Sequence, residues 1–577
     1  MVTENRDAGA EELRNARKES RGLYWAVGIF SCFVNLLMLT GPIFMLQVYD
    51  RVLGSKSEET LFALALVVAF LFAMMGLLDY ARGRVMARVG ARFQSRLDKR
   101  VFSAVMRRSA IGPSQRAQTG LGDLEAIQRL MTSPVLTSVF DMPWTPIFLA
   151  GISLFHPWLG ILAMAGGGLL ILATVLNQVA TKKSTETMGT TMNWASRMSS
   201  QMISEAEMIR SMGMQRSAFE RWKTARDKSL KATVSAADIG GAFTVSTKTF
   251  RLFLQSAMLG LGAYLALKGE ITPGAMIAGS ILMGRALAPI EMIVNQWPVV
   301  QRARTGWVNL SALLSEVGEE VPRTALPVPE AKLIVHQLTV VPPGEAQAAL
   351  RMVSFQVTPG QAVGVIGPSG AGKSTLARAL TGTWRAAGGK VRLDGASLDQ
   401  YSPENLGQYI GYLPQRVELF DGTIAENIAR LTLNPDPKKV VEAAQKADAH
   451  EMILKLPHGY DTQVAAHGGR LSGGQVQRIG LARAMFGDPV ILVLDEPNSN
   501  LDNEGSEALN TAIRATKAAG GSVLIMAHRP AAIQECDTLL ALDSGAVRAF
   551  GPRDKVMQEV LQNFKQIKNA PGPGGVQ

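Results

Sequence analysis

The strongest chemical signal in the sequence is a glycine-rich segment that ends in Lys, Ser and Thr. Gly367-Pro-Ser-Gly-Ala-Gly-Lys-Ser-Thr375 follows the apolar run Ala362–Ile366 and precedes a helix-forming stretch, Leu376–Thr381. Between a strand and a helix this pattern binds nucleotide phosphates, because glycines let backbone N–H groups approach the phosphate oxygens. We predict that Lys373 reaches the β- and γ-phosphates and that the Ser374 hydroxyl binds Mg²⁺. The predicted phosphate-binding loop comprises Gly367, Pro368, Ser369, Gly370, Ala371, Gly372, Lys373, Ser374 and Thr375.

A pair of adjacent acids supplies the rest of a hydrolytic site. Asp495 and Glu496 follow the buried-strand run Pro489–Leu494. We predict that Asp495 holds Mg²⁺ and that Glu496 orients or deprotonates the attacking water. Two acids after an apolar strand can also mark an ordinary strand end, but that interpretation is disfavoured in a chain that carries a phosphate-binding loop.

Four further motifs accompany these two in a defined order. They are Tyr412-Leu-Pro-Gln415, Leu471-Ser-Gly-Gly-Gln475, Ser499-Asn-Leu-Asp502 and Met526-Ala-His-Arg529. A lone histidine at a strand end is usually structural, yet His528 here completes a set. In type, order and spacing the six motifs resemble those of ATP-binding cassette (ABC) transporters.

The resemblance implies a role for each added motif. Gln415 corresponds to the glutamine that senses Mg²⁺ and contacts the membrane domain, so it is expected to bind the metal together with Ser374 and Asp495. His528 corresponds to the histidine at the γ-phosphate, and the expected catalytic residues are Glu496, His528 and Gln415. In this family the LSGGQ signature belongs to the ATP site of the opposite subunit, and the segment that holds Asp502 runs across the dimer interface. The expected ligands are ATP and Mg²⁺, and the expected cofactor-binding residues also include Ser472, Gly473, Gly474, Gln475 and Asp502.

One departure from the family concerns the adenine base. Members usually stack an aromatic ring on adenine from a position upstream of the phosphate-binding loop, whereas Leu338–Gly344 contains no aromatic residue. We therefore expect another contact to adenine, with Val340 and Val341 as the candidates. The selectivity for the base is left unassigned.

Composition and length require more than one domain. The chain has 577 residues, with 59 Lys plus Arg against 48 Asp plus Glu and a net charge of +11. One domain usually has roughly 100–200 residues. A hydrophobic fraction of 47% with only 19% charged residues excludes a disordered chain. Two cysteines, Cys32 and Cys536, are too few for a disulfide framework and favour a reducing compartment.

Long stretches without charge in the first half predict six membrane-spanning helices. A helix needs about 20 mainly apolar residues to cross the hydrocarbon core. The predicted spans are Leu23–Tyr49, Thr60–Leu78, two spans within Met142–Thr181 that turn at His156 and Pro157, Leu252–Leu267, and Ile271 to about Trp297.

The positive charge of the chain follows the predicted topology. Lys and Arg concentrate in the two long connections, after the second span and between the fourth and fifth spans. These connections, the N-terminus and everything after the sixth span are therefore expected in the cytoplasm, and no nucleic-acid partner is needed. Both connections have a helical composition. We expect their tips, near Gly120–Leu130 and Glu205–Gly213, to contact the soluble domain.

Three ionisable residues, Asp141, Arg285 and Glu291, fall at membrane depth or at its border. Charge in a membrane usually faces a water-filled path or a partner. Arg285 is the candidate for a hydrated passage, whereas Asp141 and Glu291 can equally mark helix ends. Glu291 follows Arg285 by six residues, which places the two on different faces of one helix.

The two halves define the expected fold class. It is a membrane all-α six-helix exporter domain, similar to type I ABC exporters, followed by an α/β P-loop ATP-binding cassette domain. From Leu333 onward, short apolar runs alternate with helical segments, which predicts a parallel sheet with crossover helices. The expected boundaries are 1–22 for a cytoplasmic N-terminal segment, 23–300 for the transmembrane domain, 301–330 for a linker, 331–565 for the cassette and 566–577 for a flexible tail.

Three segments narrow the resemblance to one branch of the family. Asp495-Glu-Pro-Asn-Ser-Asn-Leu-Asp502 departs from the usual Asp-Glu-Ala-Thr-Ser-Ala-Leu-Asp, and it occurs with Val340-Val-Pro-Pro-Gly344 and Gln47-Val-Tyr-Asp-Arg-Val-Leu53. Together they look like the PrtD-type ATPases of bacterial type I secretion. The resemblance implies ATP-driven export of unfolded proteins across the inner membrane. The expected partners are a second copy of the chain, a periplasmic membrane-fusion adaptor, an outer-membrane channel protein, and a secreted protein with a C-terminal signal.

Three other functions fit the sequence less well than protein export. A lipid or drug exporter of the same fold is disfavoured by the Asn498–Leu501 variant and the missing adenine aromatic. A non-hydrolysing, nucleotide-gated channel or scaffold is disfavoured by Glu496 and His528. A soluble ABC protein is excluded by the six spans. One cassette with six spans is half a transporter, so a homodimer is the default and a heterodimer stays open.

Overall fold

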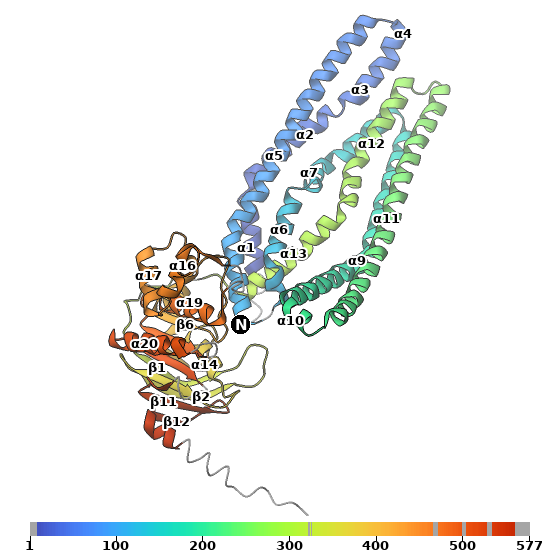
Figure 1. Cartoon of the computed structure of the whole chain (residues 1–577). Helices are drawn as coiled ribbons and strands as arrows, with labels where there is room; N and C mark the ends of the chain where they lie inside the picture. Colours follow the sequence, from blue (N-terminus) through green and yellow to red (C-terminus); the bar gives the residue numbers. More distant parts are fainter. Residues whose placement is uncertain are drawn as a thin grey trace, which may run out of the picture. The chain divides into compact units, whose positions relative to one another are not determined.

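The chain folds into two compact units, which Figure 1 shows with the elements of each labelled. The computed structural model describes residues 8–112, 114–320, 323–324, 326–464, 471–498, 503–527 and 533–559. The first unit comprises Met1–Arg108 and Ser114–Glu319, and the second comprises Ser109–Pro113 and Glu320–Gln577.

Among the described residues of the first unit, six helical segments are long and apolar enough to cross a membrane, as predicted. They are Arg21–Ser55, Glu58–Ile111, Pro134–Phe155, Pro157–Ser204, Gln215–Leu267 and Pro273–Asn295. The predicted turn at His156 and Pro157 is also confirmed. There, His156 caps the following helix, because its Nδ1 accepts a hydrogen bond from the Trp158 N–H at 3.3 Å.

Four of these segments are single helices and two are interrupted. The single helices are α5 (Glu58–Ile111), α9 (Pro157–Ser204), α11 (Gln215–Leu267) and α12 (Pro273–Asn295). The first segment consists of α2 (Arg21–Leu37), α3 (Thr40–Gln47), the π-helical turn η1 (Val48–Val52) and α4 (Leu53–Ser55), and the third consists of α7 (Pro134–Asp141), the 3₁₀ turn η2 (Met142–Trp144) and α8 (Thr145–Phe155). Pro143 and Pro146 explain the second interruption, because proline lacks the N–H that a helix interior requires.

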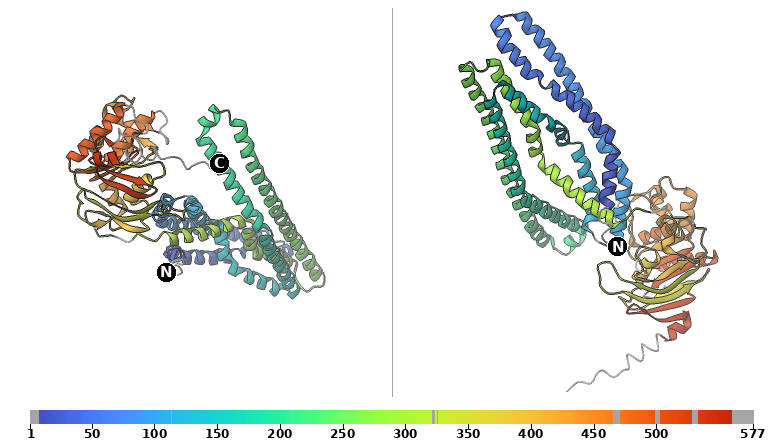
Figure 2. Two further views of the ribbon diagram at one scale, coloured as in Figure 1. Left: turned by 90° about the horizontal axis from the view of Figure 1, so that it is seen from below. Right: turned by 180° about the vertical axis from the view of Figure 1, so that it is seen from behind.

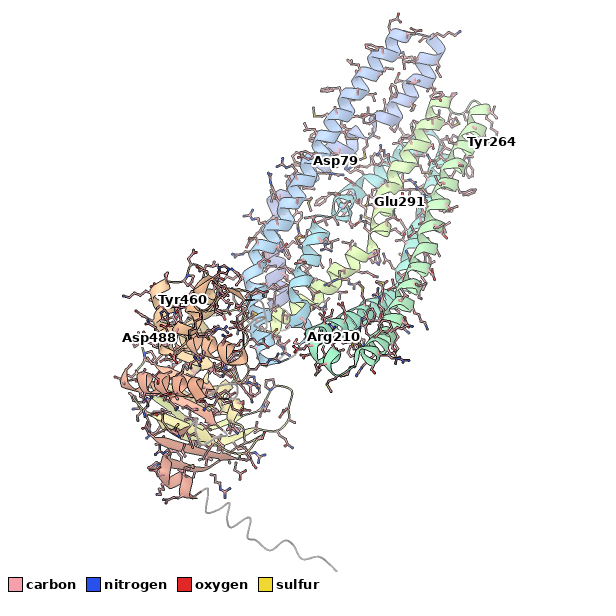
Figure 3. All side chains as sticks on the ribbon, viewed as in Figure 1. Asp79, Arg210, Tyr264, Glu291, Tyr460 and Asp488 are labelled. Atoms are coloured by element: carbon pink, nitrogen blue, oxygen red, sulfur yellow. The ribbon has the colours of Figure 1, made fainter. Side chains whose placement is uncertain are left out.

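The long connections are helical, but one predicted tip was wrong. α5 ends at Ile111 and α6 (Gln115–Met131) begins four residues later, so Gly120–Leu130 lies within a helix. The turn signal in the sequence is instead the Gly112-Pro113 pair. The second tip was placed correctly, since the short helix α10 (Ala206–Ser211) separates α9 from α11. Figure 3 labels Arg210 at this position.

Close helix packing organises the first unit. α9 and α11 contact each other extensively, and α12 packs against α3, α7, α8 and α11. Both views of Figure 2 show α9 and α11 side by side. Small residues permit this approach, as at Gly166 of α9, where a Cβ atom would lie only 2.3 Å from Leu254 of α11.

A helix occupies the first half of the predicted linker. α13 (Trp297–Glu316) packs against α1 (Ala8–Lys18) and α6, and residues 301–316 therefore belong to the first unit. Its apolar residues Leu310, Leu313 and Leu314, with Val317 directly after its end, have helical spacing and are buried, a pattern that the sequence interpretation missed. Asp123 of α6 is 1% exposed and accepts a hydrogen bond from Arg302 of α13 at 2.5 Å. The tail, 566–577, lies outside the described residues.

The second unit contains the predicted parallel sheet and an additional antiparallel sheet. The six-stranded sheet has the order β12-β11-β3-β10-β9-β6, in which the first pair alone is antiparallel. Its strands are β3 (Ala362–Ile366), β6 (Ile410–Leu413), β9 (Ile491–Asp495), β10 (Ser522–Ala527), β11 (Thr538–Asp543) and β12 (Ala546–Pro552). The four-stranded antiparallel sheet, which was not predicted, consists of β2 (Leu350–Val357), β1 (Leu333–Val340), β4 (Gly388–Leu393) and β5 (Ala396–Ser397).

Helices and two small strands complete the second unit. They are α14 (Lys373–Leu380), α15 (Pro403–Tyr409), α16 (Ile424–Ile428), α17 (Pro437–Lys446), α18 (His450–Leu454), α19 (Gly473–Met485), α20 (Asn503–Ala518), β7 (Gly422–Thr423) and β8 (Gln463–Val464). The central strands β9 and β10 are buried at every position, so side chains on both faces of the sheet contribute to a core. Leu492 and Leu494 face one core cluster, whereas Ile491 and Val493 face the other.

A buried polar cluster joins α2, α5 and α7 of the first unit. Asp141 is 9% exposed, and its Oδ1 accepts hydrogen bonds from Arg82 Nη1 at 2.7 Å and Asn35 Nδ2 at 2.6 Å. Arg82 also donates to Ser31 Oγ at 3.0 Å and to Asp79 Oδ1 at 2.7 Å. Asp141 does end α7, as considered above, but it is also half of a buried ion pair.

The cluster predicts that Arg82→Ala strongly lowers the free energy of unfolding. Removing one partner of a buried ion pair costs about 3–5 kcal/mol, because the other charge is left buried without compensation. We expect the purified protein in detergent to melt at a clearly lower temperature than the Arg88→Ala variant, which truncates an exposed arginine of the same helix. Equal melting temperatures for the two variants would contradict a stabilising role of the cluster.

Candidate functional site

The phosphate-binding loop joins the end of β3 to the start of α14. Gly370 and Gly372 have φ values of +79° and +97°, in the region that favours glycine. A Cβ atom at Gly372 would lie 2.9 Å from Ala349 O and 2.7 Å from Leu350 Cδ2. The loop therefore requires glycine here both for its backbone conformation and for its close approach to the neighbouring segment.

Lys373 lies inside this loop and is only 5% exposed. Its Nζ donates hydrogen bonds to Gly367 O at 2.9 Å and Pro368 O at 3.0 Å. Burial lowers the pKa of the Lys373 ammonium, and the nearby Glu496 and Asp495 act in the opposite direction. The ammonium is thus held by loop carbonyls at the start of α14.

Ser374 and Asp495 provide oxygen atoms suited to Mg²⁺. Ser374 Oγ donates a hydrogen bond to Asp495 Oδ1 at 3.2 Å. Asp495 is 2% exposed, and burial raises its pKa while the Ser374 hydrogen bond opposes that shift. In the described part of the chain no group of three or more His, Cys, Asp or Glu side chains could hold a metal. One hydroxyl and one carboxylate fit a Mg²⁺ ion whose other ligands are substrate phosphates and water.

Gln415 and Glu496 are also brought together. Gln415, two residues beyond β6, donates from Nε2 to Glu496 Oε2 at 2.9 Å. Tyr412 of β6 lies nearby, and burial together with the Asp495 charge raises its pKa to about 12. Five of the predicted site residues therefore form one cluster, namely Lys373, Ser374, Gln415, Asp495 and Glu496.

The LSGGQ residues lie on a separate element, the start of α19. Ser472 Oγ accepts a hydrogen bond from Gln475 N at 3.3 Å, and Gln475 Oε1 accepts one from Ser472 N at 2.9 Å, which forms a capping box. Gly473 and Gly474 occupy the first turn, where helix N–H groups can bind an anion. Two predicted site residues, Asp502 and His528, lie outside the described residues.

One adenine candidate was wrong. Val340 is the last residue of β1 and is completely buried in the core of the second unit, so it has no surface for a base. The pleat of the strand directs its side chain into that core. Val341 is half-buried and stays a candidate.

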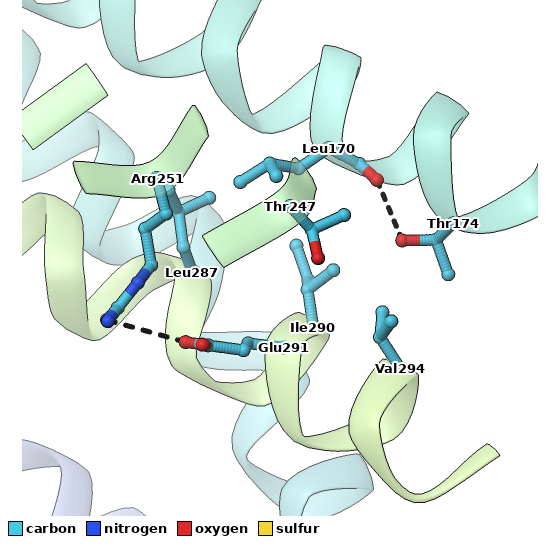
Figure 4. A pocket seen from close by; sticks show the side chains of 8 residues that line it. All are labelled: Leu170, Thr174, Thr247, Arg251, Leu287, Ile290, Glu291 and Val294. Carbon is cyan, nitrogen blue, oxygen red and sulfur yellow. Dashed lines mark hydrogen bonds and ion pairs between the residues drawn. The ribbon is translucent and has the colours of Figure 1, made fainter. Parts of the chain in front are cut away.

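An ion pair in the first unit was missed by the sequence interpretation. Arg251 Nη1 of α11 lies 3.4 Å from Glu291 Oε2 of α12, beside a small pocket (Figure 4). The pocket is lined by Leu170, Thr174, Thr247, Arg251, Leu287, Ile290, Glu291 and Val294. The available signal was the hairpin geometry, since Arg251 lies sixteen residues before the end of α11 and Glu291 eighteen residues after the start of α12.

Arg285 has a different environment from Glu291. α12 is largely enclosed by its neighbours, yet Arg285, Ala288, Met292 and Asn295 are exposed. Their spacing of three and four residues places them on one face of the helix. α12 thus presents one open face, and Arg285 is its charged residue.

Comparisons with known proteins agree with both units. The family described as ABC transporter transmembrane region matches residues 24–288, and the family described as ABC transporter matches residues 350–499. A bacterial Atm1-family ABC exporter with ATP bound has the same fold, with a TM-score of 0.79 over 96% of this chain and 99% of that chain at 22% identity.

Two relatives cover nearly the whole chain. The leukotoxin translocation ATP-binding protein LktB of Mannheimia glucosida is 27% identical over 93% of this chain and 77% of its own length. The type I secretion system ATP-binding protein PrsD of Rhizobium meliloti (strain 1021) is 41% identical over 95% of this chain and 94% of its own length. With six apolar helices of membrane-spanning length in the described part of the chain and a P-loop site on a parallel sheet, the chain belongs to the ABC transporters of the type I secretion family.

Proposed function

We propose that this chain is the ABC component of a type I secretion system and uses ATP hydrolysis to export unfolded proteins. The observation that carries this proposal is the 41% identity to a type I secretion ATP-binding protein across both units. We assign residues 23–300 to the transmembrane domain and 331–565 to the ATPase domain. Its place is the inner membrane, with the N-terminus and the ATPase domain in the cytoplasm, because the long connections carry the excess of Lys and Arg.

The site cluster supports hydrolysis at the γ-phosphorus. Glu496 accepts a proton from water as the water oxygen attacks, and the bond from the γ-phosphorus to the bridging oxygen of ADP breaks. Gln415 holds the Glu496 carboxylate through its hydrogen bond of 2.9 Å. Lys373 exchanges its loop carbonyls for phosphate oxygens. Ser374 and Asp495, with Gln415 beside them, would hold Mg²⁺, which when bound would neutralise phosphate charge. We assign the γ-phosphate contact to His528.

A second copy of the chain completes each site. Ser472–Gln475 hydrogen-bond within their own helix turn and present the N-terminus of α19. We propose that this N-terminus binds the ATP held by Lys373 of the partner, with Asp502 at the interface between the copies. The working transporter is then a homodimer with two shared sites.

The remaining partners follow from the export route. We propose a periplasmic membrane-fusion adaptor and an outer-membrane channel protein, which together carry the substrate past the outer membrane. The substrate is a secreted protein with a C-terminal signal. The alternative, export of lipid or drug-like molecules, has no comparable support from the full-length relatives.

Glu496→Gln tests hydrolysis and export together. The variant keeps the shape of the side chain but loses the base, so ATP binding persists while turnover falls by roughly 10²–10⁴-fold. Cells that express the transporter, its adaptor, its channel and a secreted protein should then retain that protein. The measurements are ATPase activity of the purified protein and substrate in the medium.

Two controls separate the possible failures. Deleting the C-terminal signal of the secreted protein should stop its export by the wild-type transporter without changing the basal ATPase activity of the transporter. Wild-type turnover by Glu496→Gln contradicts the assigned base. ATP-dependent movement of a fluorescent lipid across the membrane, with no export of the secreted protein, contradicts the proposal that the substrate is a protein.

Arg285 is predicted to face the hydrated passage. An arginine that faces lipid at the membrane centre costs about 2.5–3.5 kcal/mol even on insertion scales, so water or the partner copy should contact this open face. In a chain without Cys32 and Cys536, Arg285→Cys should react with a small, water-soluble thiol reagent. The matched control is Leu66→Cys, an exposed apolar position on α5 that should not react.

The alanine variant gives the functional measurement at the same site. Arg285→Ala should insert normally and keep its basal ATPase activity while export changes. Protection of Arg285→Cys in every nucleotide state, together with normal export by Arg285→Ala, would assign the residue a structural role instead.

A further inference from the structure

Glu496 has an unusual backbone conformation. Its φ is +50°, in the left-handed region that non-glycine residues rarely adopt. The next residue is Pro497, and a residue before proline is further restricted by the proline ring. Pro497 belongs to the segment in which this chain departs from the common motif. Such a conformation at a catalytic carboxylate persists only where neighbouring groups hold it.

Hydrogen bonds hold the backbone on both sides of the Glu496 side chain. Glu496 N donates to Met526 O of β10 at 3.0 Å. Pro497 O accepts from Nε2 of Gln477, a residue of α19, at 3.1 Å. Gln477 is 2% exposed, so this hydrogen bond is shielded from water.

The same helix also holds the segment that follows Gln415. Arg483, six residues beyond Gln477 on α19, donates from Nη1 to Glu418 O at 2.9 Å. α19 therefore donates hydrogen bonds to backbone carbonyls shortly after both Gln415 and Glu496, at Glu418 and Pro497. The two segments that carry the 2.9 Å hydrogen bond of that pair are thus both hydrogen-bonded to α19.

We infer that Gln477 is a positioning residue of the ATPase, which orients the Glu496 carboxylate by holding the carbonyl of Pro497. This inference rests on the proposed role of Glu496 as the base. α19 begins at the LSGGQ residues, so the helix that presents its N-terminus to phosphate also fixes the base of its own chain. If the sites are shared as proposed, Gln477 connects the two ATP molecules of the dimer.

The test uses Gln477→Met, which keeps the length of the side chain and removes the donor, in the purified full-length protein. A misplaced base lowers the rate without weakening binding, and a small displacement can cost about 10²-fold. We expect kcat to fall between about ten- and a hundredfold, with unchanged KM and unchanged displacement of a fluorescent ATP analogue. Gln445→Leu, which removes an exposed glutamine of α17, should keep the wild-type kcat.

A double variant distinguishes positioning from general damage. In the Glu496→Gln background the base is already lost, so Gln477→Met should lower the residual turnover no further. An unchanged kcat for Gln477→Met overturns the inference. A further loss in the Glu496→Gln background, or a parallel loss of ATP affinity and melting temperature, overturns it as well. These outcomes do not depend on cargo, so they leave the proposal of protein export to its own experiment.

Discussion

The hydrogen bond between the Ser374 hydroxyl and the Asp495 carboxylate joins the two elements on which the ATPase site depends. It joins the start of α14 to the end of β9 over 3.2 Å, although the two residues are far apart in the chain. Two parallel pairings bring them together, because Ile366 is level with Ala527 and Asp495 is level with Met526. The carboxyl ends of β3, β10 and β9 thus meet at one edge of the sheet, where the phosphate-binding loop and both acids emerge.

In the membrane unit, charged side chains of different helices form ion pairs with one another. Arg82 with Asp141, and Arg251 with Glu291, form ion pairs between helices. The first pair joins α5 to α7, which are not consecutive, and the second joins the consecutive helices α11 and α12. Arg285 has no such partner in the described part of the chain and lies on the open face of α12. The distinction between paired and open charges separates structural from functional candidates better than depth alone.

The sequence predicted local features well and long-range pairs poorly. The phosphate-binding loop, the two acids and Gln415 were predicted because each motif is set by the chemistry of phosphate and Mg²⁺. Six spans were predicted because the hydrocarbon core imposes a length. Pairs such as Arg82 with Asp141 and Gln477 with Pro497 join different elements without a local signal, so tertiary packing must be known first. α13 was not predicted because the prolines from Pro322 onward are typical of a linker, whereas the helical pattern that precedes them becomes clear only with its burial.

The proposed mechanism requires ATP sites shared by two copies, because the LSGGQ residues cap a helix separate from the loop of Lys373. The most direct measurement is the ATPase activity of mixed dimers, isolated through two different tags. Lys373→Ala on one copy and Gly474→Asp on the other leave one intact shared site, so activity should match that of a dimer with a single damaged site. Both substitutions on one copy, opposite a wild-type copy, damage both shared sites and should abolish activity. The reverse pattern, inactive in the first dimer and active in the second, would contradict the account.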